Sequence, residues 1–124
     1  MTETYFFDSY AFFEFIAKNS AYEPFQYVPF VTTKLNLFEL YYGLLQQNQE
    51  KLATFLLEEY SPYALDFETD VLIYAAQFKY AHKKRKLSMT DCIGYTFAKK
   101  LGVPFLTGDK EFKNMNNVVF LPKS

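Results

Sequence analysis

Short apolar segments alternate along this chain with longer segments that have the helical period. Continuous apolar or β-branched runs, which are typical of buried strands, occur at residues 4–7, 30–32, 63–65, 105–107 and 118–121. Such an alternation of strands and helices favours an α/β fold. We expect a three-layer α/β/α arrangement with a central, mostly parallel sheet of about four or five short strands.

The predicted helices are bounded by polar caps, glycine or proline. They are expected at residues 9–17, 33–47 and 49–60, from Asp66 or Thr69 to residue 86, and at residues 88–101, with a short helical turn after residue 109. A hydroxyl can cap three of them, from Ser9, from Thr32 or Thr33, and from Ser88 or Thr90. The last turn of the fourth helix would hold Lys83 to Lys86, where cations complement the helix dipole.

The second predicted helix has a wide apolar surface. Leu35, Phe38, Tyr42 and Leu45 form one stripe at helical spacing, and further leucine and tyrosine residues widen it. We expect most of these side chains to lie in the core. Some of the aromatic ones would remain for a dimer interface or a partner groove.

The composition indicates a folded chain with one domain, residues 1–124. Half of the 124 residues are apolar and 21% are aromatic, far more than a disordered chain carries. The first residues include no Lys or Arg, and no apolar run approaches the roughly 20 residues of a membrane span. Cys92 is the single cysteine. We therefore expect a cytoplasmic location, no membrane contact and no internal disulfide bond.

Four acidic residues stand where an α/β fold would bring them to one edge of the sheet. Asp8 follows the first strand, Asp91 opens a helix, and Asp109 follows the strand at residues 105–107. Ligands bind beyond the carboxyl ends of parallel strands. Glu39 joins the other acids if its helix crosses this edge. Like charges about 4 Å apart repel by roughly 1 to 4 kcal/mol. A hard cation removes that repulsion, and all-oxygen ligands select Mg²⁺ or Mn²⁺.

These acids and their neighbours resemble the motifs of the PIN-domain ribonucleases, especially the small toxins of VapBC type. Asp8 stands in Phe-Phe-Asp-Ser, Glu39 in Asn-Leu-Phe-Glu-Leu, Asp91 in Leu-Ser-Met-Thr-Asp-Cys-Ile and Asp109 in Phe-Leu-Thr-Gly-Asp-Lys-Glu-Phe. The resemblance covers nearly the whole chain. It implies a doubly wound sheet and metal-dependent cleavage of RNA that leaves a 5′-phosphate.

The resemblance also implies a role for each acid around one or two Mg²⁺ or Mn²⁺ ions. Asp8 and Asp91 would be the principal metal ligands. Asp109 would bind metal directly or through water, and Glu39 would hold a metal-bound water. All four would be catalytic residues of a divalent-metal-dependent endoribonuclease.

Ser9 and Thr107 stand beside these acids and would orient the carboxylates by hydrogen bonds. Toxins of this kind pair with an antitoxin in type II toxin–antitoxin systems. The resemblance therefore implies a small protein partner that holds the nuclease inactive, and a homodimer.

The net charge of −1 does not exclude a nucleic-acid substrate, because the basic residues are clustered. Commitment of four acids to a cation would leave a basic surface, and phosphate binding needs a local patch rather than a high total charge. The candidate RNA-binding and phosphate-binding residues are Lys83, Lys84, Arg85, Lys110 and Lys113.

Two other functions fit part of the pattern. A phospho-accepting receiver domain shares the length, the alternation and an acidic edge, but it predicts paired acids after the first strand, where Asp8 stands alone. A PIN fold could also bind RNA or protein without cleavage. Each acid has a purely structural explanation as well: Asp8 as a helix cap, Asp91 as a first-turn acid, Asp109 as a turn residue and Glu39 as a solvent-facing side chain.

Overall fold

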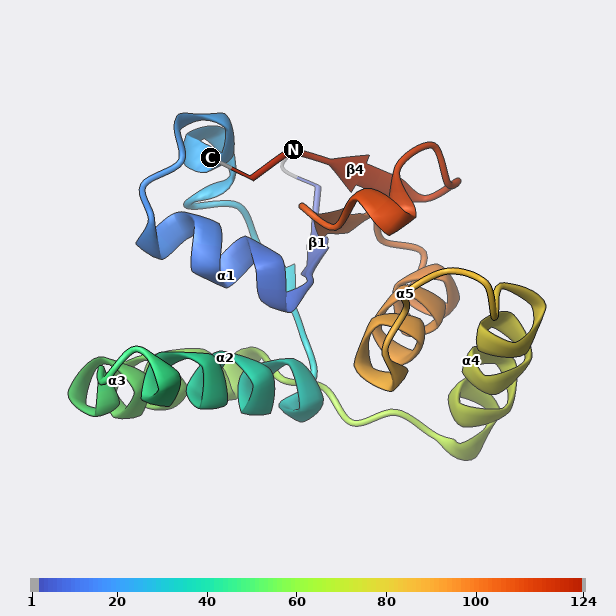
Figure 1. Cartoon of the computed structure of the whole chain (residues 1–124), viewed down its shortest axis with the longest axis horizontal. Helices are drawn as coiled ribbons and strands as arrows, with labels where there is room; N and C mark the ends of the chain where they lie inside the picture. The colour runs from blue at the N-terminus through green and yellow to red at the C-terminus, as the bar shows by residue number, and fades with distance from the viewer. Residues whose placement is uncertain (1–2, 124) are drawn as a thin grey trace.

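A computed structural model describes residues 3–123, which are arranged around one parallel sheet (Figure 1). Its strands are β1 (Tyr5–Phe7), β2 (Phe30–Val31), β3 (Phe105–Thr107) and β4 (Val118–Phe120), in the order β2-β1-β3-β4. Every pairing in this sheet is parallel. Met1 and Thr2, which begin the segment expected to carry no signal peptide, lie outside the described residues, as does Ser124.

Helices cover both faces of this sheet (Figure 1). One face packs against α1 (Ser9–Ile16), α2 (Lys34–Gln46) and α3 (Glu50–Tyr60), and the other against α4 (Thr69–Ala81) and α5 (Met89–Leu101). Short 3₁₀ helices lie at η1 (Ser20–Phe25), η2 (Ser61–Tyr63) and η3 (Lys110–Phe112). The predicted three-layer α/β/α fold is confirmed. None of the described helices is both long enough and apolar enough to cross a membrane.

The two central strands, β1 and β3, are buried on both sides because successive side chains point into opposite layers. Phe6 and Phe105 pack with α4 and α5, and their rings stack with centroids 5.6 Å apart. Phe7 and Leu106 pack with α1, α2 and α3. Each strand therefore needs a continuous apolar run, which is the pattern that identified these strands in the sequence.

The strand order places a ligand-binding edge beside β1. The chain leaves β1 for β2 on one side, and then crosses back to β3 on the other side. A crevice forms where the direction of winding reverses, beyond the carboxyl ends of the strands. Asp8 directly follows β1 and Gly108 directly follows β3, so both lie at this edge.

The strand predicted at residues 63–65 is wrong. Ser61–Tyr63 form η2, and only Ala64 makes a β-bridge, to Thr32. Pro62 explains the difference. Its fixed φ and missing N–H suit the first turn of a helix and do not suit a central strand.

The fourth helix is shorter than predicted. It ends at Ala81, and the basic run from Lys83 to Lys86 lies in a turn and the loop that follows. Nδ1 of His82 lies 2.9 Å from a carbonyl oxygen of the preceding helical turn, and Arg85 donates a hydrogen bond to the Glu111 carbonyl. These contacts direct the chain away from the helix axis. Four adjacent cations would also repel one another in a continued helix.

α2 buries a different stripe from the predicted one. The side chains of Leu37, Leu40 and Leu44 are buried, whereas Phe38 is 69% exposed and Tyr42 is 55% exposed. A wide arc of this helix is apolar and contains both stripes, so periodicity cannot choose between them. The packing of α2 against α1 and α3 makes the choice.

Gly94 allows α5 to approach the sheet closely. A Cβ atom at this position would lie 3.2 Å from ring carbons of both Phe6 and Phe105. We expect Gly94→Val to lower the free energy of unfolding by about 1 to 3 kcal/mol, because the added carbons overpack a buried contact. Urea denaturation measures this loss.

Ala76→Val is the control for this prediction, since Ala76 lies on an exposed position of α4. It should cost about 0.5 kcal/mol, from helix propensity alone. An equal loss of stability in both variants would contradict the close approach as the cause.

Candidate active site

Asp8 is the buried centre of the acidic edge. It has no exposed surface and stands at the N-cap of α1. Its Oδ1 accepts hydrogen bonds from the Ser9 amide at 2.9 Å and from Asn36 Nδ2 at 3.4 Å, and its Oδ2 accepts one from the Thr107 hydroxyl at 2.7 Å. Asp8 thus caps the helix that Ser9 was expected to cap. Its carboxylate is fixed by α1, α2 and β3 together.

The Ser9 side chain links α1 to α2 instead. Its Oγ donates a hydrogen bond to Glu39 Oε1 at 2.7 Å and accepts one from Asn36 Nδ2 at 3.1 Å. Glu39 is half-buried. The helix that carries Glu39 therefore crosses the acidic edge, which was the condition for this acid to join the others.

Asn36 is a site residue that the sequence did not reveal. It is fully buried, and its Oδ1 accepts a hydrogen bond from the Thr33 hydroxyl at 2.7 Å while its Nδ2 reaches Asp8 and Ser9. Thr33 also caps α2, because its Oγ1 accepts from the Asn36 amide at 3.2 Å. The spacing between Asn36 and Glu39 could have revealed Asn36 as a site residue, since residues three apart on a helix share one face.

Asp91 is positioned by the first turn of α5. Its amide donates a hydrogen bond to Ser88 Oγ at 3.1 Å, and its Oδ2 accepts one from the Ser88 amide at 2.8 Å, which forms a reciprocal capping box. The residue is 8% exposed. Since the Ser88 amide engages Oδ2, Oδ1 is left for another partner.

Asp109 closes the edge from the side of β3. Its amide donates a hydrogen bond to Thr107 Oγ1 at 3.0 Å, and its Oδ1 accepts one from the Glu111 amide at 2.9 Å, which caps η3. Thr107 is fully buried. Its hydroxyl contacts Asp8 and the Asp109 backbone at once and so links two of the acids.

An open cleft of about 890 Å³ lies at this edge. We call it the acidic cleft, because Glu39, Asp91 and Asp109 line it together with Ser9. Asp8 lies behind this lining and contacts it through Ser9. The structure thus gathers all four predicted acids, from four separate segments of the chain, around one cleft.

The predicted phosphate-binding residues lie in two places. Lys110 and Lys113 line a second cleft next to the acidic one. Lys83 lies over an aromatic ring of α4, and Arg85 donates a hydrogen bond to a loop carbonyl. Neither of them, nor Lys84, is among the described residues that line the two clefts.

Burial and mutual repulsion raise the pKa of two acids. The pKa of Asp8 is well above its usual range, first because of burial and then because of the Asp91 charge; hydrogen bonds from Thr107 and Ser9 oppose the shift. Burial also raises the pKa of Asp91 to about 6, with a further contribution from the Asp109 charge, against the lowering effect of its capping bond. A cation beside these carboxylates would favour their ionised forms.

The donor set fits a hard divalent cation. Residues 3–123 contain no group of three Asp, Glu, His or Cys side chains that could hold a metal ion in their present positions. The four acids nevertheless offer only oxygen ligands, which Mg²⁺ and Mn²⁺ prefer. Burial and mutual repulsion raise the pKa of Asp8 and of Asp91, so a cation at the site would relieve a cost that both carboxylates carry when ionised.

The fold and the cleft define an α/β protein with an acidic site at the carboxyl edge of its parallel sheet. Residues 5–118 match the family model for the PIN domain. The chain therefore belongs to the PIN domain family. A comparison with curated proteins found no match.

Solved structures share this fold at low sequence identity. A chain of a toxin–antitoxin complex from Klebsiella pneumoniae superimposes with a TM-score of 0.74 at 14% identity, covering 97% of this chain and 99% of that one. A chain of VapBC2 from Rickettsia felis, bound to a DNA fragment from its promoter, superimposes with a TM-score of 0.70 at 17% identity, covering 98% of this chain and 99% of that one. A chain of VapBC-5 from Mycobacterium tuberculosis has a TM-score of 0.66 at 21% identity, covering 96% of this chain and 98% of that one.

The raised pKa of Asp91 predicts a pH-dependent stability in the absence of metal. Between about pH 4 and pH 6 the folded chain binds more protons at Asp91 than the unfolded chain, so the free energy of unfolding falls as the pH rises. The loss from this residue should reach about 3 kcal/mol at neutral pH. Asp91→Asn should therefore be more stable than the unmodified chain at neutral pH in EDTA, and less dependent on pH. Urea denaturation at several pH values measures both effects.

Asp66→Asn is the matched control, because Asp66 is an exposed acid outside the cleft. It should leave the pH dependence of the unmodified chain in place. The same dependence in Asp91→Asn would show that burial of this carboxylate carries no cost in stability.

Proposed function

We propose that this chain is a divalent-metal-dependent endoribonuclease that hydrolyses RNA phosphodiester bonds and leaves a 5′-phosphate. The observation that carries the proposal is the convergence of Asp8, Glu39, Asp91 and Asp109 on one cleft in a PIN domain. We further propose that it acts as the toxin of a type II toxin–antitoxin pair. The fold that it shares with chains of toxin–antitoxin complexes supports this role.

In this mechanism Asp8 and Asp91 would hold the metal, Asp109 would bind it directly or through water, and Glu39 would orient a water. Mg²⁺ or Mn²⁺ bound there would supply an activated water and neutralise the phosphate. Thr107 holds Asp8 in place by the 2.7 Å hydrogen bond to Oδ2. On the α2 side of the site, the Ser9 hydroxyl holds Glu39 by a hydrogen bond, and Asn36 Nδ2 in turn holds the Ser9 hydroxyl.

Lysines at the cleft would offset the negative charge of the acids when RNA approaches. Lys86 and Lys123 line the acidic cleft, and Lys110 and Lys113 line its neighbour. A phosphate backbone requires such contacts, since its affinity for protein is largely electrostatic. The segment Lys83 to Arg85 stays a predicted RNA contact outside the two clefts.

Substitution of the principal acids tests the nuclease function. Asp8→Asn and Asp91→Asn should each lower the rate of RNA cleavage by more than about a hundred-fold, because they remove a charged ligand and leave side-chain volume unchanged. EDTA should stop cleavage by the unmodified chain, and Mn²⁺ should restore it. Gel analysis of end-labelled RNA measures the rate and identifies the 5′-phosphate.

Asp66→Asn should cleave at the unmodified rate, and circular dichroism should show that all three variants are folded. Undiminished cleavage by Asp8→Asn would refute the site assignment. Binding of RNA without cleavage, under any divalent metal, would favour a PIN fold that only binds.

The receiver-domain alternative has less support. A receiver domain needs a second acid next to Asp8 after β1, and Ser9 stands there instead, with its hydroxyl hydrogen-bonded to Glu39. The acid on the α2 side, Glu39, lies within a helix rather than beside Asp8 after β1.

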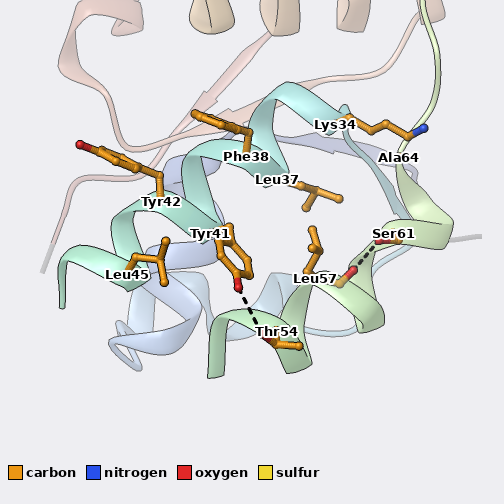
Figure 2. A pocket seen from close by; sticks show the side chains of 10 residues that line it. All are labelled: Lys34, Leu37, Phe38, Tyr41, Tyr42, Leu45, Thr54, Leu57, Ser61 and Ala64. Carbon is orange, nitrogen blue, oxygen red and sulfur yellow. Dashed lines mark hydrogen bonds between the residues drawn. The ribbon is translucent and has the colours of Figure 1, made fainter. Parts of the chain in front are cut away.

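We propose that an antitoxin binds along α2 and α3. These helices form an apolar groove of about 550 Å³, lined by Phe38, Tyr41, Tyr42, Leu45 and Leu57 among others (Figure 2). The exposed rings of Phe38 and Tyr42 lie parallel, with centroids 6.3 Å apart, and both also line the acidic cleft. A partner seated in this groove can therefore extend a basic residue toward the acids, where its charge is complementary.

Leu45→Asp tests this docking site, since Leu45 is exposed in the apolar groove and does not line the acidic cleft. Purified antitoxin should inhibit RNA cleavage by the unmodified chain, and Leu45→Asp should need at least about ten-fold more antitoxin for the same inhibition. Without antitoxin, Leu45→Asp should cleave RNA at the same rate as the unmodified chain. Equal inhibition of both chains would place the antitoxin elsewhere.

A homodimer and a cytoplasmic location are proposed on the same family resemblance. Sedimentation equilibrium of the purified chain measures the first, and cell fractionation measures the second.

A further inference from the structure

A second cleft, of about 480 Å³, opens beside the acidic cleft. Its lining includes Tyr10, Lys110, Lys113, Phe120 and Lys123, and we call it the basic cleft. Three residues, Tyr10, Asp109 and Lys123, line both clefts. The two are therefore continuous, and a ligand in one can extend into the other.

The two clefts differ in charge. Among its described lining residues, the basic cleft has three lysines and one acid, Asp109. The acidic cleft has four acids, Glu14, Glu39, Asp91 and Asp109, and two lysines. A polyanion that places one phosphate at the acids would thus find compensating positive charge on the side of the basic cleft.

Aromatic rings in the basic cleft are paired with its lysines. Nζ of Lys123 lies 4.6 Å from the centroid of the Tyr10 ring, and Nζ of Lys113 lies 5.9 Å from that of Phe120. A ring with a cation at its face offers both stacking and charge. Proteins that bind single-stranded nucleic acid use this combination, with aromatic rings for the bases and cations for the backbone.

The segment that carries Lys123 is held in place by the body of the protein. The Tyr22 hydroxyl donates a hydrogen bond to the Leu121 carbonyl at 2.8 Å, and Asn19 Nδ2 donates to the Pro122 carbonyl at 3.0 Å. Gly108 permits this approach, since a Cβ atom there would lie 3.0 Å from the Leu121 carbonyl oxygen. Lys123 is thus presented to Tyr10 by an anchored backbone.

We propose that the basic cleft binds the nucleotide adjacent to the scissile phosphate of an unpaired RNA strand. Tyr10 stacks on its base, and Lys113 and Lys123 contact its flanking phosphates. An unpaired strand is required because a base must leave its own stack to lie on a protein ring. The proposal rests on the nuclease function, since it takes the acidic cleft as the place of the scissile phosphate.

Salt dependence of RNA binding tests the lysines. The probe is a short, unpaired, fluorescently labelled oligoribonucleotide, bound to the Asp91→Asn chain in EDTA so that no cleavage occurs. The slope of log K against log salt concentration should become shallower by about 0.7 in Lys113→Gln, and by about 0.7 in the separate variant Lys123→Gln, because each variant loses one phosphate contact. Lys51→Gln, an exposed lysine of α3, should leave the slope unchanged.

Replacement of Tyr10 tests the stacking. Tyr10→Leu should weaken binding of the same oligoribonucleotide by roughly ten-fold with an unchanged salt slope, because one base–ring contact is lost. The Tyr10→Phe variant keeps the aromatic ring and should bind the oligoribonucleotide with the affinity of the chain that retains Tyr10. Equal weakening by Leu and Phe would refute stacking on this ring.

These outcomes separate the subsite from the nuclease function. If the unmodified chain cleaves RNA while the lysine variants keep its affinity and salt slope, the subsite is refuted and the nuclease stands. If no RNA is cleaved but the slopes change as expected, the basic cleft binds RNA and the nuclease proposal fails. Lysine variants that lose inhibition by an antitoxin and keep RNA affinity would assign the cleft to a protein partner, which overturns the proposal.

Discussion

The burial of Asp8 beside other carboxylates is the constraint on which the site depends. An ionised carboxylate without exposed surface is costly to the folded state unless donors or cations compensate. The chain supplies donors from Ser9, Asn36 and Thr107, which lie on α1, α2 and β3. One side chain thus ties three elements together. The neighbouring charges of Asp91 and Glu39 add repulsion that these donors only partly oppose. A cation at this site would therefore stabilise the ionised carboxylates.

Helix capping is the device that brings the acids to one edge. Asp8 caps α1, Asp91 belongs to the capping box of α5, and Asp109 caps η3. In a parallel sheet flanked by helices, strands end and helices begin at the same edge, so capping acids at successive junctions gather there. The structural and functional explanations of these residues are therefore compatible. Each cap engages part of a carboxylate and fixes its direction. The shared cleft brings the carboxylates of Glu39, Asp91 and Asp109 to one place.

The sequence predicted those features whose signals are local. Strands buried on both faces, such as the one around Phe6, need continuous apolar runs. Asp8, Asp91 and Asp109 stand beside strand and helix ends that caps and glycine mark. Other features depend on tertiary contacts. Packing against α1 and α3 decides that Leu37 rather than Phe38 lies on the buried side of α2. Asn36 contacts Asp8 because α2 crosses the sheet edge, and the sequence alone does not show that crossing. Lys123 and Tyr10 stand at opposite ends of the chain, and no periodicity connects them.

The acidic cleft lies between two surfaces of opposite character. Phe38 and Tyr42 connect it to the apolar groove on α2, and Tyr10 and Lys123 connect it to the basic cleft. A protein partner bound to the apolar groove and an RNA strand bound to the basic cleft would therefore approach the acids from different sides. They would compete for the acids themselves and not for their own docking surfaces. In the proposed complex, a basic residue of the partner at the acids would supply positive charge to the same carboxylates that would hold a metal, and the burial of Asp8 makes such a charge favourable there.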